Sequence, residues 1–321
     1  MHMHTPDYWY GIDLGGTKME LVACDAALTV HHRQRIPTPH DYHSLVAALT
    51  ALVRDADAAL GVQGVPPPVG IGVPGIVDAA GRHLCANIAC LTGRVLLPVL
   101  HQLLDRAITL GNDCQCFALS EAHGGAGAGA DSLFGLIIGT GAGAGYVVDG
   151  RLVRGRHGAA GEWGHWPLDP HLLRRHELPL LPCACGRAAC LERYVSGTGL
   201  RDLHAHLGGA GHSAEQLAAQ LAAQLTAGDA LAARVFDLHL DLLGAALAHI
   251  ILAYDPHVVV LGGGLSQLPH LYTGLPAAIV PHLIPGLGVP PILPPAFGDA
   301  GGARGAALLA RQAFTNSTQE S

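Results

Sequence analysis

The chain has 321 residues, of which 50% are hydrophobic, 13% are charged and only 5% are aromatic. This length predicts about two domains. The formal net charge is −7 and no basic block occurs, so the electrostatic footprint of a nucleic-acid-binding protein is missing. The longest uncharged apolar stretch, 133–148, contains five glycines, and the first ten residues include His, Asp and Pro. We therefore expect a cytoplasmic protein with neither a membrane span nor a signal peptide.

Short apolar runs alternate with runs of helical spacing in the first half of the chain, which predicts a mixed α/β structure. The expected elements are strands over 8–14 and 19–25, a helix over 44–60, a strand over 69–73, a helix over 96–104, a strand over 108–110 and a helix over 116–123. A glycine turn at 15–17 joins the first two strands as a hairpin.

The strand–glycine–strand pattern returns near the middle of the chain, which predicts an internally duplicated fold. The later elements are expected to be strands over 133–138 and 146–148 joined by a glycine turn, helices over 214–225 and 230–253, a strand over 258–261, a proline-rich connection over 281–295 and a closing amphipathic helix over 303–314. The last few residues are polar, and we expect no regular structure there.

Three glycine-rich turns follow predicted strands, at 13–18, 139–145 and 262–264. Glycine lets backbone N–H groups approach an anion closely. The spacing of a Walker loop is absent, and the second turn runs into a strand, unlike a dinucleotide fingerprint. A plain hairpin explains any one turn equally well, but three together favour phosphate binding. The first turn also carries an acid, Asp13, a hydroxyl, Thr17, and the only lysine of the chain, Lys18.

Cys183, Cys185 and Cys190 lie within eight residues, and His165 precedes them by eighteen. Three thiolates and one imidazole are a typical ligand set for a closed tetrahedral zinc site. The alternative is three cysteines that are simply buried, but the surrounding Pro, Gly and Arg indicate a loop. The spacing therefore predicts a structural zinc ion without a catalytic role.

The glycine turns resemble the two phosphate hairpins and the adenosine loop of sugar kinases with the actin-like fold. The Glu-Trp-Gly-His motif at 162–165, followed by the cysteine segment 183–192, is similar to the ROK family (repressors, open reading frames and kinases). The resemblance covers about 10–309. It implies a two-domain α/β fold of the actin-like (ribonuclease H-like) class with a structural zinc loop. A small domain over 1–118, completed by 303–314, would precede a large domain over 119–302.

The resemblance also implies the site residues. On local sequence alone, Asn112-Asp113 predicts a helix N-cap, whereas in the family this Asp is the catalytic base. Sugar hydroxyls would bind Asn87, Asn112, Asp113, Glu162, His165 and Glu192. ATP, with Mg2+ near Asp13, would bind Asp13, Gly15, Gly16, Thr17, Lys18, Thr140, Gly141, Gly263 and Gly264. The zinc ligands would be His165, Cys183, Cys185 and Cys190. One departure from the family is Ala189, where relatives usually have Gly.

The implied activity is ATP-dependent phosphorylation of the primary hydroxyl of a hexose by a homodimer. Three segments, 120–122, 160–168 and 196–199, look most like fructokinases (mannofructokinases), so we expect fructose to yield fructose 6-phosphate. N-acetylglucosamine kinase is the next alternative, followed by glucokinase. A sugar-sensing repressor is a remote alternative because only twelve residues precede Asp13, too few for a DNA-binding domain. A zinc-dependent binding protein without catalysis is the other.

Overall fold

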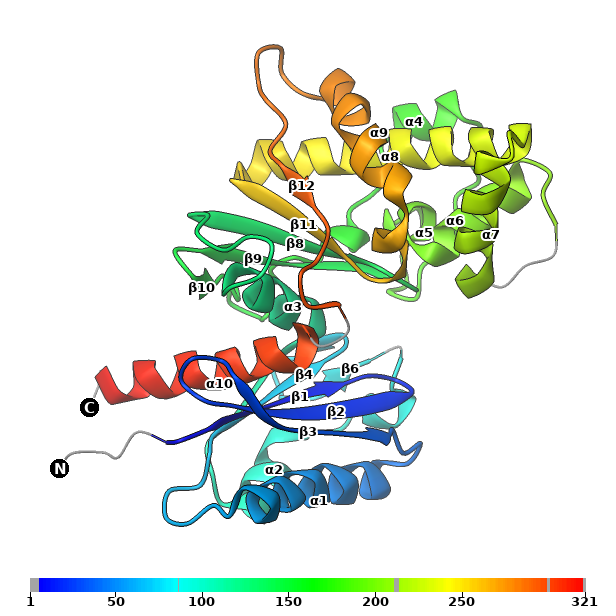
Figure 1. Cartoon of the computed structure of the whole chain (residues 1–321). Helices are drawn as coiled ribbons and strands as arrows, with labels where there is room; N and C mark the ends of the chain where they lie inside the picture. The colour runs from blue at the N-terminus through cyan, green and yellow to red at the C-terminus, as the bar shows by residue number, and fades with distance from the viewer. Residues whose placement is uncertain (1–5, 86, 211–213, 299–300, 320–321) are drawn as a thin grey trace. The chain divides into compact units, whose positions relative to one another are not determined.

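The computed structural model describes residues 6–85, 87–210, 214–298 and 301–319 (Figure 1). The chain separates into two compact units. The first contains the N-terminal part as far as Gly125, the segment Gly145–Ala160 and the C-terminal part from Phe297. The second contains Ala126–Ala144 and Gly161–Ala296. The described residues contain two five-stranded sheets and one two-stranded sheet.

The first unit has a sheet of strand order β3-β2-β1-β4-β7, in which β1, β4 and β7 are parallel and β1, β2 and β3 are antiparallel. The strands are β1 (Trp9–Leu14), β2 (Lys18–Cys24), β3 (Val30–Pro37), β4 (Val69–Val73) and β7 (Ile108–Asn112). The helices are α1 (Tyr42–Leu60), α2 (Leu97–Leu104), α3 (Asp113–Ala122) and α10 (Gly301–Gln319). A small hairpin, β5 (Ile76–Val77) and β6 (His83–Leu84), and a 3-10 turn, η1 (Ala89–Leu91), follow β4.

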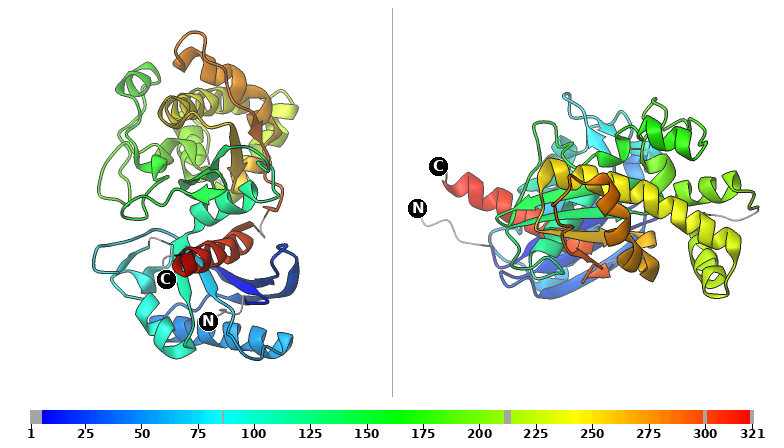
Figure 2. Two further views of the ribbon diagram at one scale, coloured as in Figure 1. Left: turned by 90° about the vertical axis from the view of Figure 1, so that its left-hand side faces the viewer. Right: turned by 90° about the horizontal axis from the view of Figure 1, so that it is seen from above.

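The two faces of this sheet are covered differently. Helices α1 and α2 bury aliphatic side chains against one face, and α10 lies along the other (Figure 2). On the α10 side the backbones come very close, because a Cβ atom at Gly11 would lie 1.9 Å from Ala303 O and one at Gly70 would lie 1.8 Å from Ala306 O. These two strands therefore need glycine to admit the helix. That contact places the closing helix in the first unit.

The second five-stranded sheet has strand order β10-β9-β8-β11-β12, and its strands β8, β11 and β12 and the start of β9 belong to the second unit. The strands are β8 (Ser132–Ile138), β9 (Ala142–Val148), β10 (Arg151–Leu152), β11 (Val258–Gly262) and β12 (Ile292–Leu293). The helices are α4 (Pro170–Arg175), α5 (Glu192–Val195), α6 (Gly197–His206), α7 (Ala214–Thr226), α8 (Ala230–Tyr254) and α9 (Pro269–Ile279), with 3-10 turns η2 (Trp163–His165), η3 (Gly264–Gln267) and η4 (Val280–His282). As in the first sheet, strands joined by a glycine turn are neighbours and later strands add in parallel. The repeated topology agrees with the predicted duplication.

Helix α8 is long and apolar enough to cross a membrane by length and composition alone. However, 72% of its most apolar window is buried inside the protein. It packs against α5, α6, α7 and α9. Helix α8 is therefore the central core helix of the second unit.

The segment Gly145–Ala160 differs from the expected domain boundary, because it clusters with the first unit and not with the large domain. The reason is its anchoring. The Arg154 guanidinium donates to Leu110 O at 2.7 Å, and the Gln312 amide donates to Gly150 O at 2.7 Å. The strand itself is pressed on α3, since a Cβ atom at Gly145 would lie 2.7 Å from Gln115 Cα.

Other boundaries also differ from the sequence expectations. Helix α3 begins at Asp113 and not at 116, and β9 begins at Ala142, inside the predicted glycine turn. The proline-rich connection contains η4 and β12. The closing helix continues to Gln319, beyond the predicted end at 314 and through polar residues where we expected no regular structure.

Candidate active site and metal centre

The first glycine turn joins β1 and β2 and is held by the end of β3. The Gly15 N–H donates to Lys18 O at 3.0 Å, which closes the hairpin. Thr38 then fixes the turn twice, because its hydroxyl donates to Gly15 O at 2.7 Å and its N–H donates to Thr17 O at 3.0 Å. The turn therefore has a defined backbone conformation, as a phosphate-binding loop requires.

Gly16 lies directly against the segment of Asn87. A Cβ atom at Gly16 would lie only 2.7 Å from Asn87 O, so no other residue fits without a shift of the backbone. The Asn87 side chain is exposed. The structure thus brings a predicted nucleotide-binding residue and a predicted sugar-binding residue together within the first unit.

Asp13 and Asp113 come from β1 and from the start of α3, and both act on the buried thiol of Cys116. Burial raises the pKa of Cys116, and the negative charges of Asp13 and then Asp113 raise it further. Asp13 also faces the start of α10, because a Cβ atom at Gly302 would lie 2.7 Å from its Oδ2. The two carboxylates therefore gather near the carboxyl ends of the parallel strands, where α/β sheets bind ligands.

The helix N-cap predicted for this segment is Asn112 and not Asp113. Asn112 Oδ1 accepts from the N–H groups of Cys114, at 2.8 Å, and of Gln115, at 3.4 Å. The Asn112 amide donates to Gly75 O at 3.0 Å. The cap is thus provided without Asp113, which leaves its carboxylate for another role.

The Asp113 carboxyl is half-buried, and its Oδ1 accepts from the Cys114 N–H at 2.9 Å. Burial raises the pKa of Asp113 above its ordinary value, and the Cys114 hydrogen bond only partly offsets this effect. A carboxylate with a raised pKa is a better proton acceptor than a solvated one. Asp113 is therefore suited to act as a general base.

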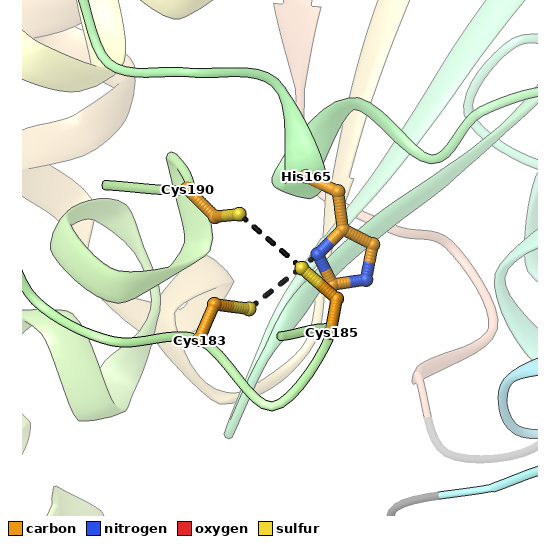
Figure 3. A group of neighbouring side chains, drawn as sticks. All are labelled: His165, Cys183, Cys185 and Cys190. Atoms are coloured by element: carbon orange, nitrogen blue, oxygen red, sulfur yellow. Dashed lines mark hydrogen bonds between the residues drawn. The ribbon is translucent and has the colours of Figure 1, made fainter. Parts of the chain in front are cut away.

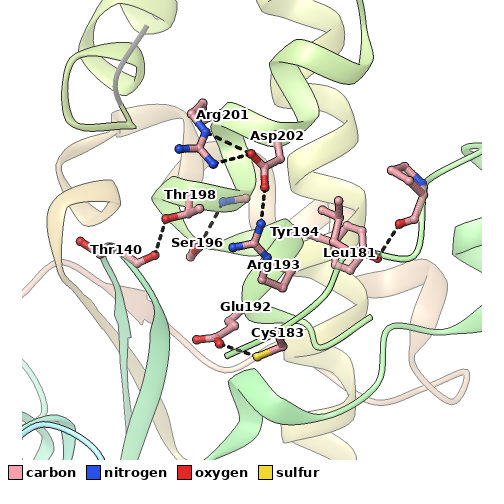
Figure 4. Close-up of polar contacts among 12 residues, drawn as sticks. Thr140, Leu181, Cys183, Glu192, Arg193, Tyr194, Ser196, Thr198, Arg201 and Asp202 are labelled. Carbon is pink, nitrogen blue, oxygen red and sulfur yellow. Dashed lines mark hydrogen bonds and ion pairs between the residues drawn. The ribbon is translucent and has the colours of Figure 1, made fainter. Parts of the chain in front are cut away.

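The second glycine turn lies in the other unit and is held by the start of α6 (Figure 4). The Gly139 N–H donates to Gly141 O at 3.0 Å, and the Gly197 N–H donates to Gly139 O at 2.7 Å. The Thr198 hydroxyl donates to Thr140 O at 2.8 Å. These bonds fix the turn between β8 and β9 as firmly as Thr38 fixes the first turn.

The third turn follows β11 and lies beside the second. Gly263 has a φ of +80° and is close to β8, because a Cβ atom there would lie 2.7 Å from Ile138 O. Only glycine fits both the conformation and the space. The structure therefore places Thr140, Gly141, Gly263 and Gly264 together at one end of the second sheet.

The four predicted zinc ligands converge in the second unit (Figure 3). Their ligand atoms, from His165, Cys183, Cys185 and Cys190, all lie within 4.8 Å of one another. Cys185 Sγ is 3.5 Å from Cys190 Sγ, and Cys183 Sγ is 3.6 Å from His165 Nδ1. A tetrahedral zinc with Zn–S bonds of about 2.3 Å would place two sulfurs about 3.7 Å apart and a sulfur and an imidazole nitrogen about 3.5 Å apart. The four residues fit zinc.

Arg187 supports this loop electrostatically. Its guanidinium donates to His165 O at 2.9 Å and, by hydrogen bonding to Cys185, lowers the pKa of that exposed thiol to about 6. Burial instead raises the pKa of Cys183 and Cys190. Thiolate is the form that binds metal, and Arg187 favours it at Cys185.

The predicted sugar-binding acids of this unit surround the same cluster. Glu192 Oε1 lies 3.0 Å from Cys183 Sγ (Figure 4). It is also 3.7 Å from His165 Nδ1, and Glu162 Oε2 lies 3.7 Å from His165 Nε2. Gly141 is also close, because a Cβ atom there would lie 3.0 Å from Glu192 Oε2. Glu192 therefore lies beside both the second glycine turn and the cysteine cluster, and Glu162 lies beside His165.

The sequence analysis did not identify the residues that hold the cysteine loop through hydrogen bonds and an ion pair. The buried Tyr194 hydroxyl donates to Pro179 O at 2.7 Å and accepts from the Leu181 N–H at 3.1 Å (Figure 4). Arg193 pairs with Asp202 of α6 at 2.6 Å. The only sequence signal was their place directly after Glu192, which identifies neither partner.

Ala189 has a φ of +57°, so this residue adopts the left-handed conformation that its position demands. Its N–H donates to Leu181 O at 2.9 Å and its carbonyl accepts from the Leu168 N–H at 2.8 Å, so the conformation is fixed on both sides. The left-handed conformation costs a residue with a side chain about 1–2 kcal/mol, and glycine avoids this cost. Glycine instead loses about 0.5–1 kcal/mol more backbone entropy on folding than alanine does.

We therefore expect Ala189→Gly to raise the free energy of unfolding by up to about 1 kcal/mol, measured by chemical denaturation of the metal-loaded protein. The matched control is Ala188→Gly, one residue earlier and without a positive φ, which should destabilise the loop slightly. A lower stability for Ala189→Gly than for wild type would contradict the strain argument.

Comparison with known proteins agrees with this arrangement. The family model described as "ROK family" matches residues 9–313. The chain is 43% identical over 302 residues to an N-acetylgalactosamine kinase of Shewanella sp., covering 94% of this chain and 96% of the relative. It is 42% identical over 306 residues to an N-acetyl-D-glucosamine kinase of Pectobacterium atrosepticum, covering 94% and 98%.

Among solved structures, the ROK hexokinase of Thermus thermophilus superposes with a TM-score of 0.83 at 31% identity, covering 96% of this chain and 99% of that one. The predicted α/β fold of the actin-like sugar kinases is thereby confirmed. The matched model extends from β1 into α10, so both five-stranded sheets, all three glycine turns and the cysteine loop lie inside it. This chain belongs to the ROK family and is a sugar kinase of that family.

Proposed function

We propose that the protein transfers the γ-phosphate of ATP to the primary hydroxyl of an N-acetylhexosamine, either N-acetylglucosamine or N-acetylgalactosamine. The observation that carries this proposal is the pair of curated relatives above, which align over 94% of the chain and are named as kinases of these two sugars. Fructose, which we expected from the segments 120–122, 160–168 and 196–199, has no support among them. The alternative prediction, N-acetylglucosamine kinase, is therefore the better one.

Asp113 is proposed as the base for this reaction. Its carboxylate would accept the proton of the sugar's primary hydroxyl as that oxygen attacks the γ-phosphate. The raised pKa of Asp113, caused by burial, makes proton transfer to it easier. Asn112, held by its bonds to Gly75 and to the start of α3, would orient a neighbouring hydroxyl, as would Asn87.

The second unit would supply the remaining sugar contacts. Glu162, His165 and Glu192 lie together at the cysteine loop. With Nδ1 of His165 directed to the metal position, Nε2 remains to contact a sugar hydroxyl or Glu162. Sugar recognition needs several directional polar groups, and these three provide both donors and acceptors.

The nucleotide would bind the glycine turns. Backbone N–H groups around Gly15, Gly16 and Thr17 in one unit, and around Thr140 and Gly141 in the other, would contact its phosphates. Gly263 and Gly264 would lie at the adenosine. Lys18, exposed at the start of β2, would approach a phosphate. Asp13 would hold Mg2+, which would supply positive charge to the transferred phosphoryl group.

Zinc is proposed as a structural ion at His165, Cys183, Cys185 and Cys190. This proposal is supported by the four ligand atoms, which all lie within 4.8 Å of one another, and by two of their separations, 3.5 and 3.6 Å, which are close to the edge of a tetrahedral site. With four protein ligands the metal has no open position, so it would order the loop and take no part in the chemistry.

A sugar panel tests the proposed activity. In a coupled ADP-release assay, we expect N-acetylglucosamine or N-acetylgalactosamine to give a kcat/KM at least about tenfold above those of glucose and fructose, because a pocket built for the acetamido group leaves polar groups unpaired without it. A higher kcat/KM for fructose or glucose would overturn the N-acetylhexosamine assignment. Absence of phosphorylation of every sugar would overturn the activity itself.

A further inference from the structure

Gln115 makes a contact that no assigned role explains. It lies in the first turn of α3, two residues after Asp113, and is only 2% exposed. Its Nε2 donates to Gly158 O at 2.9 Å and to Ala160 O at 3.0 Å. The amide nitrogen therefore donates two hydrogen bonds to the backbone of 158–160, a stretch that belongs to no helix or strand.

This stretch ends a loop that is tied down at its other end as well. The Arg154 guanidinium donates to Leu110 O at 2.7 Å, and the Ala160 N–H donates to Arg154 O at 3.4 Å. Neighbouring β9 is pressed on the same helix turn at Gly145. The loop from Arg154 to Ala160 is thus attached to the strand and the helix that carry Asn112 and Asp113.

The chain leaves the first unit directly after Gln115's second partner. The division between the units falls between Ala160 and Gly161. Gly161 has a φ of +101°, so the backbone turns there in a way that favours glycine. Glu162 is the next residue, and His165 follows in the same 3-10 turn.

From these contacts we propose that Gln115 is a positioning residue for sugar binding, which holds the point from which the backbone enters the Glu162–His165 segment at a fixed place relative to Asp113. The inference rests on the proposed sugar kinase function. Gln115 touches no reacting group itself. Its role is to connect the helix that carries the base to the loop that leads to the sugar-binding acid, through two hydrogen bonds from one rigid amide group.

The physical reason is the precision that the reaction requires. A misplacement of about 1 Å of a substrate-positioning group can lower a rate by about 10²-fold. Without Gln115's amide, the carbonyls of Gly158 and Ala160 lose their donors in a partly buried site, and the loop moves to recover hydrogen bonds to water. The first phosphate turn has its own support from Thr38, so ATP binding should be spared.

The test compares Gln115→Leu with Gln312→Leu. Both variants remove a glutamine amide that bonds to the same segment of backbone, since Gln312 Nε2 donates to Gly150 O at 2.7 Å, far along the chain from Glu162. For Gln115→Leu we expect a KM for N-acetylhexosamine raised at least about tenfold, a KM for ATP changed less than about twofold, and weaker sugar binding in calorimetry without turnover. Gln312→Leu should change neither KM.

Equal effects of the two variants on sugar KM, or equal effects of Gln115→Leu on the KM for sugar and for ATP, would overturn the proposal. Thermal denaturation checks folding. If Gln115→Leu does not fold, Gln115→Asn keeps an amide one methylene shorter, and the same KM comparison decides. Should wild type prefer a different sugar, the proposed substrate fails, and the comparison with that sugar still tests Gln115.

Discussion

Replacing Asp113 with Asn should lower kcat by about 10²- to 10⁴-fold, the usual cost of removing a general base. The substitution keeps the size and the hydrogen-bonding shape of the side chain, and the amide oxygen can still accept from the Cys114 N–H as Asp113 Oδ1 does. An amide, however, cannot accept the proton of the attacking hydroxyl. Sugar affinity, measured by calorimetry without turnover, should therefore change far less than kcat.

The matched control is Asp41→Asn, in the same unit. Asp41 caps α1, where its Oδ1 accepts from the Ser44 N–H at 2.9 Å. Because Asn caps a helix about as well as Asp, this variant should keep wild-type kcat. Near-normal kcat in Asp113→Asn would mean that Asp113 is not the base. The Asn112-Asp113 pair would then serve only to cap α3, which Asn112 does.

The pH dependence gives a second readout of the same residue. Because burial raises the pKa of Asp113, its charged form is disfavoured in the folded protein. The acid limb of wild-type kcat/KM should therefore lie above the ordinary Asp pKa of about 3.9. The contribution of neutral Asp113 to the free energy of unfolding is fully present below the pKa that the carboxyl has in the unfolded chain. It is lost as the pH rises through the higher pKa that the carboxyl has in the folded protein. At neutral pH Asp113→Asn should thus unfold no more easily than wild type.

Elements with a strong local pattern could be predicted from the sequence. The strand expected over 69–73 matches β4 residue for residue. All five of its residues are buried, and a five-residue apolar run between two prolines is too short for a typical helix. Helix α1 shows its buried residues, among them Leu45, Leu49 and Leu52, at helical spacing. In both cases burial alone determines the pattern.

Strand β3 could not be predicted, because its stability comes from a partner distant in the sequence. It is mostly polar, with apolar residues only at Val30, Ile36 and Pro37, and its residues pair with β2. Arg33 and Arg35 bind the carboxylate of Glu20, whose side chain is only 5% exposed. A strand whose exposed and half-buried residues alternate, but whose middle residues are all polar, shows no hydrophobic alternation in a single sequence.

The second glycine run shows why a motif and its boundaries differ in predictability. Residues 139–141 (Gly-Thr-Gly) form the turn, but β9 already begins at Ala142. Gly145 is a glycine because α3 lies against it, since a Cβ atom there would lie 2.7 Å from Ala118 Cβ. Sequence alone does not distinguish a glycine needed for close packing from one that approaches a phosphate.

The candidate site divides in the same way. The cysteine cluster was predictable because ligands close in sequence share one loop, and the structure brings His165 to it. The closeness of Asp13 and Asp113 to one buried thiol, and the bonds of Gln115 to Gly158 and Ala160, depend on tertiary contacts. No local pattern encodes them.

Replacing a proposed zinc ligand, Cys185, should have the second large effect, which is a loss of zinc and weaker sugar binding. Wild-type protein should contain about one zinc per chain by elemental analysis, since four ligands form one closed site. Cys185→Ser should lose most of that zinc. Cys185 is exposed, so the change from sulfur to oxygen removes little buried surface and acts through the metal. Cys90→Ser, which alters a partly exposed cysteine outside the cluster, is the control and should retain zinc.

Loss of zinc should weaken sugar binding much more than ATP binding. Without the ion, the thiols of Cys183 and Cys190 no longer hold the loop to His165, and Glu192 and Glu162 lose the common anchor that sets their distances to that imidazole. We expect the KM for sugar to rise at least about tenfold, comparable with the 10- to 100-fold cost of disturbing the partners of a metal site. The turns that would bind ATP are held by Thr38 and Thr198, outside the loop.

A zinc-free Cys185→Ser enzyme with wild-type sugar kinetics would contradict the structural role of the metal. An equal rise in the KM for ATP would mean instead that the loop supports the whole second unit.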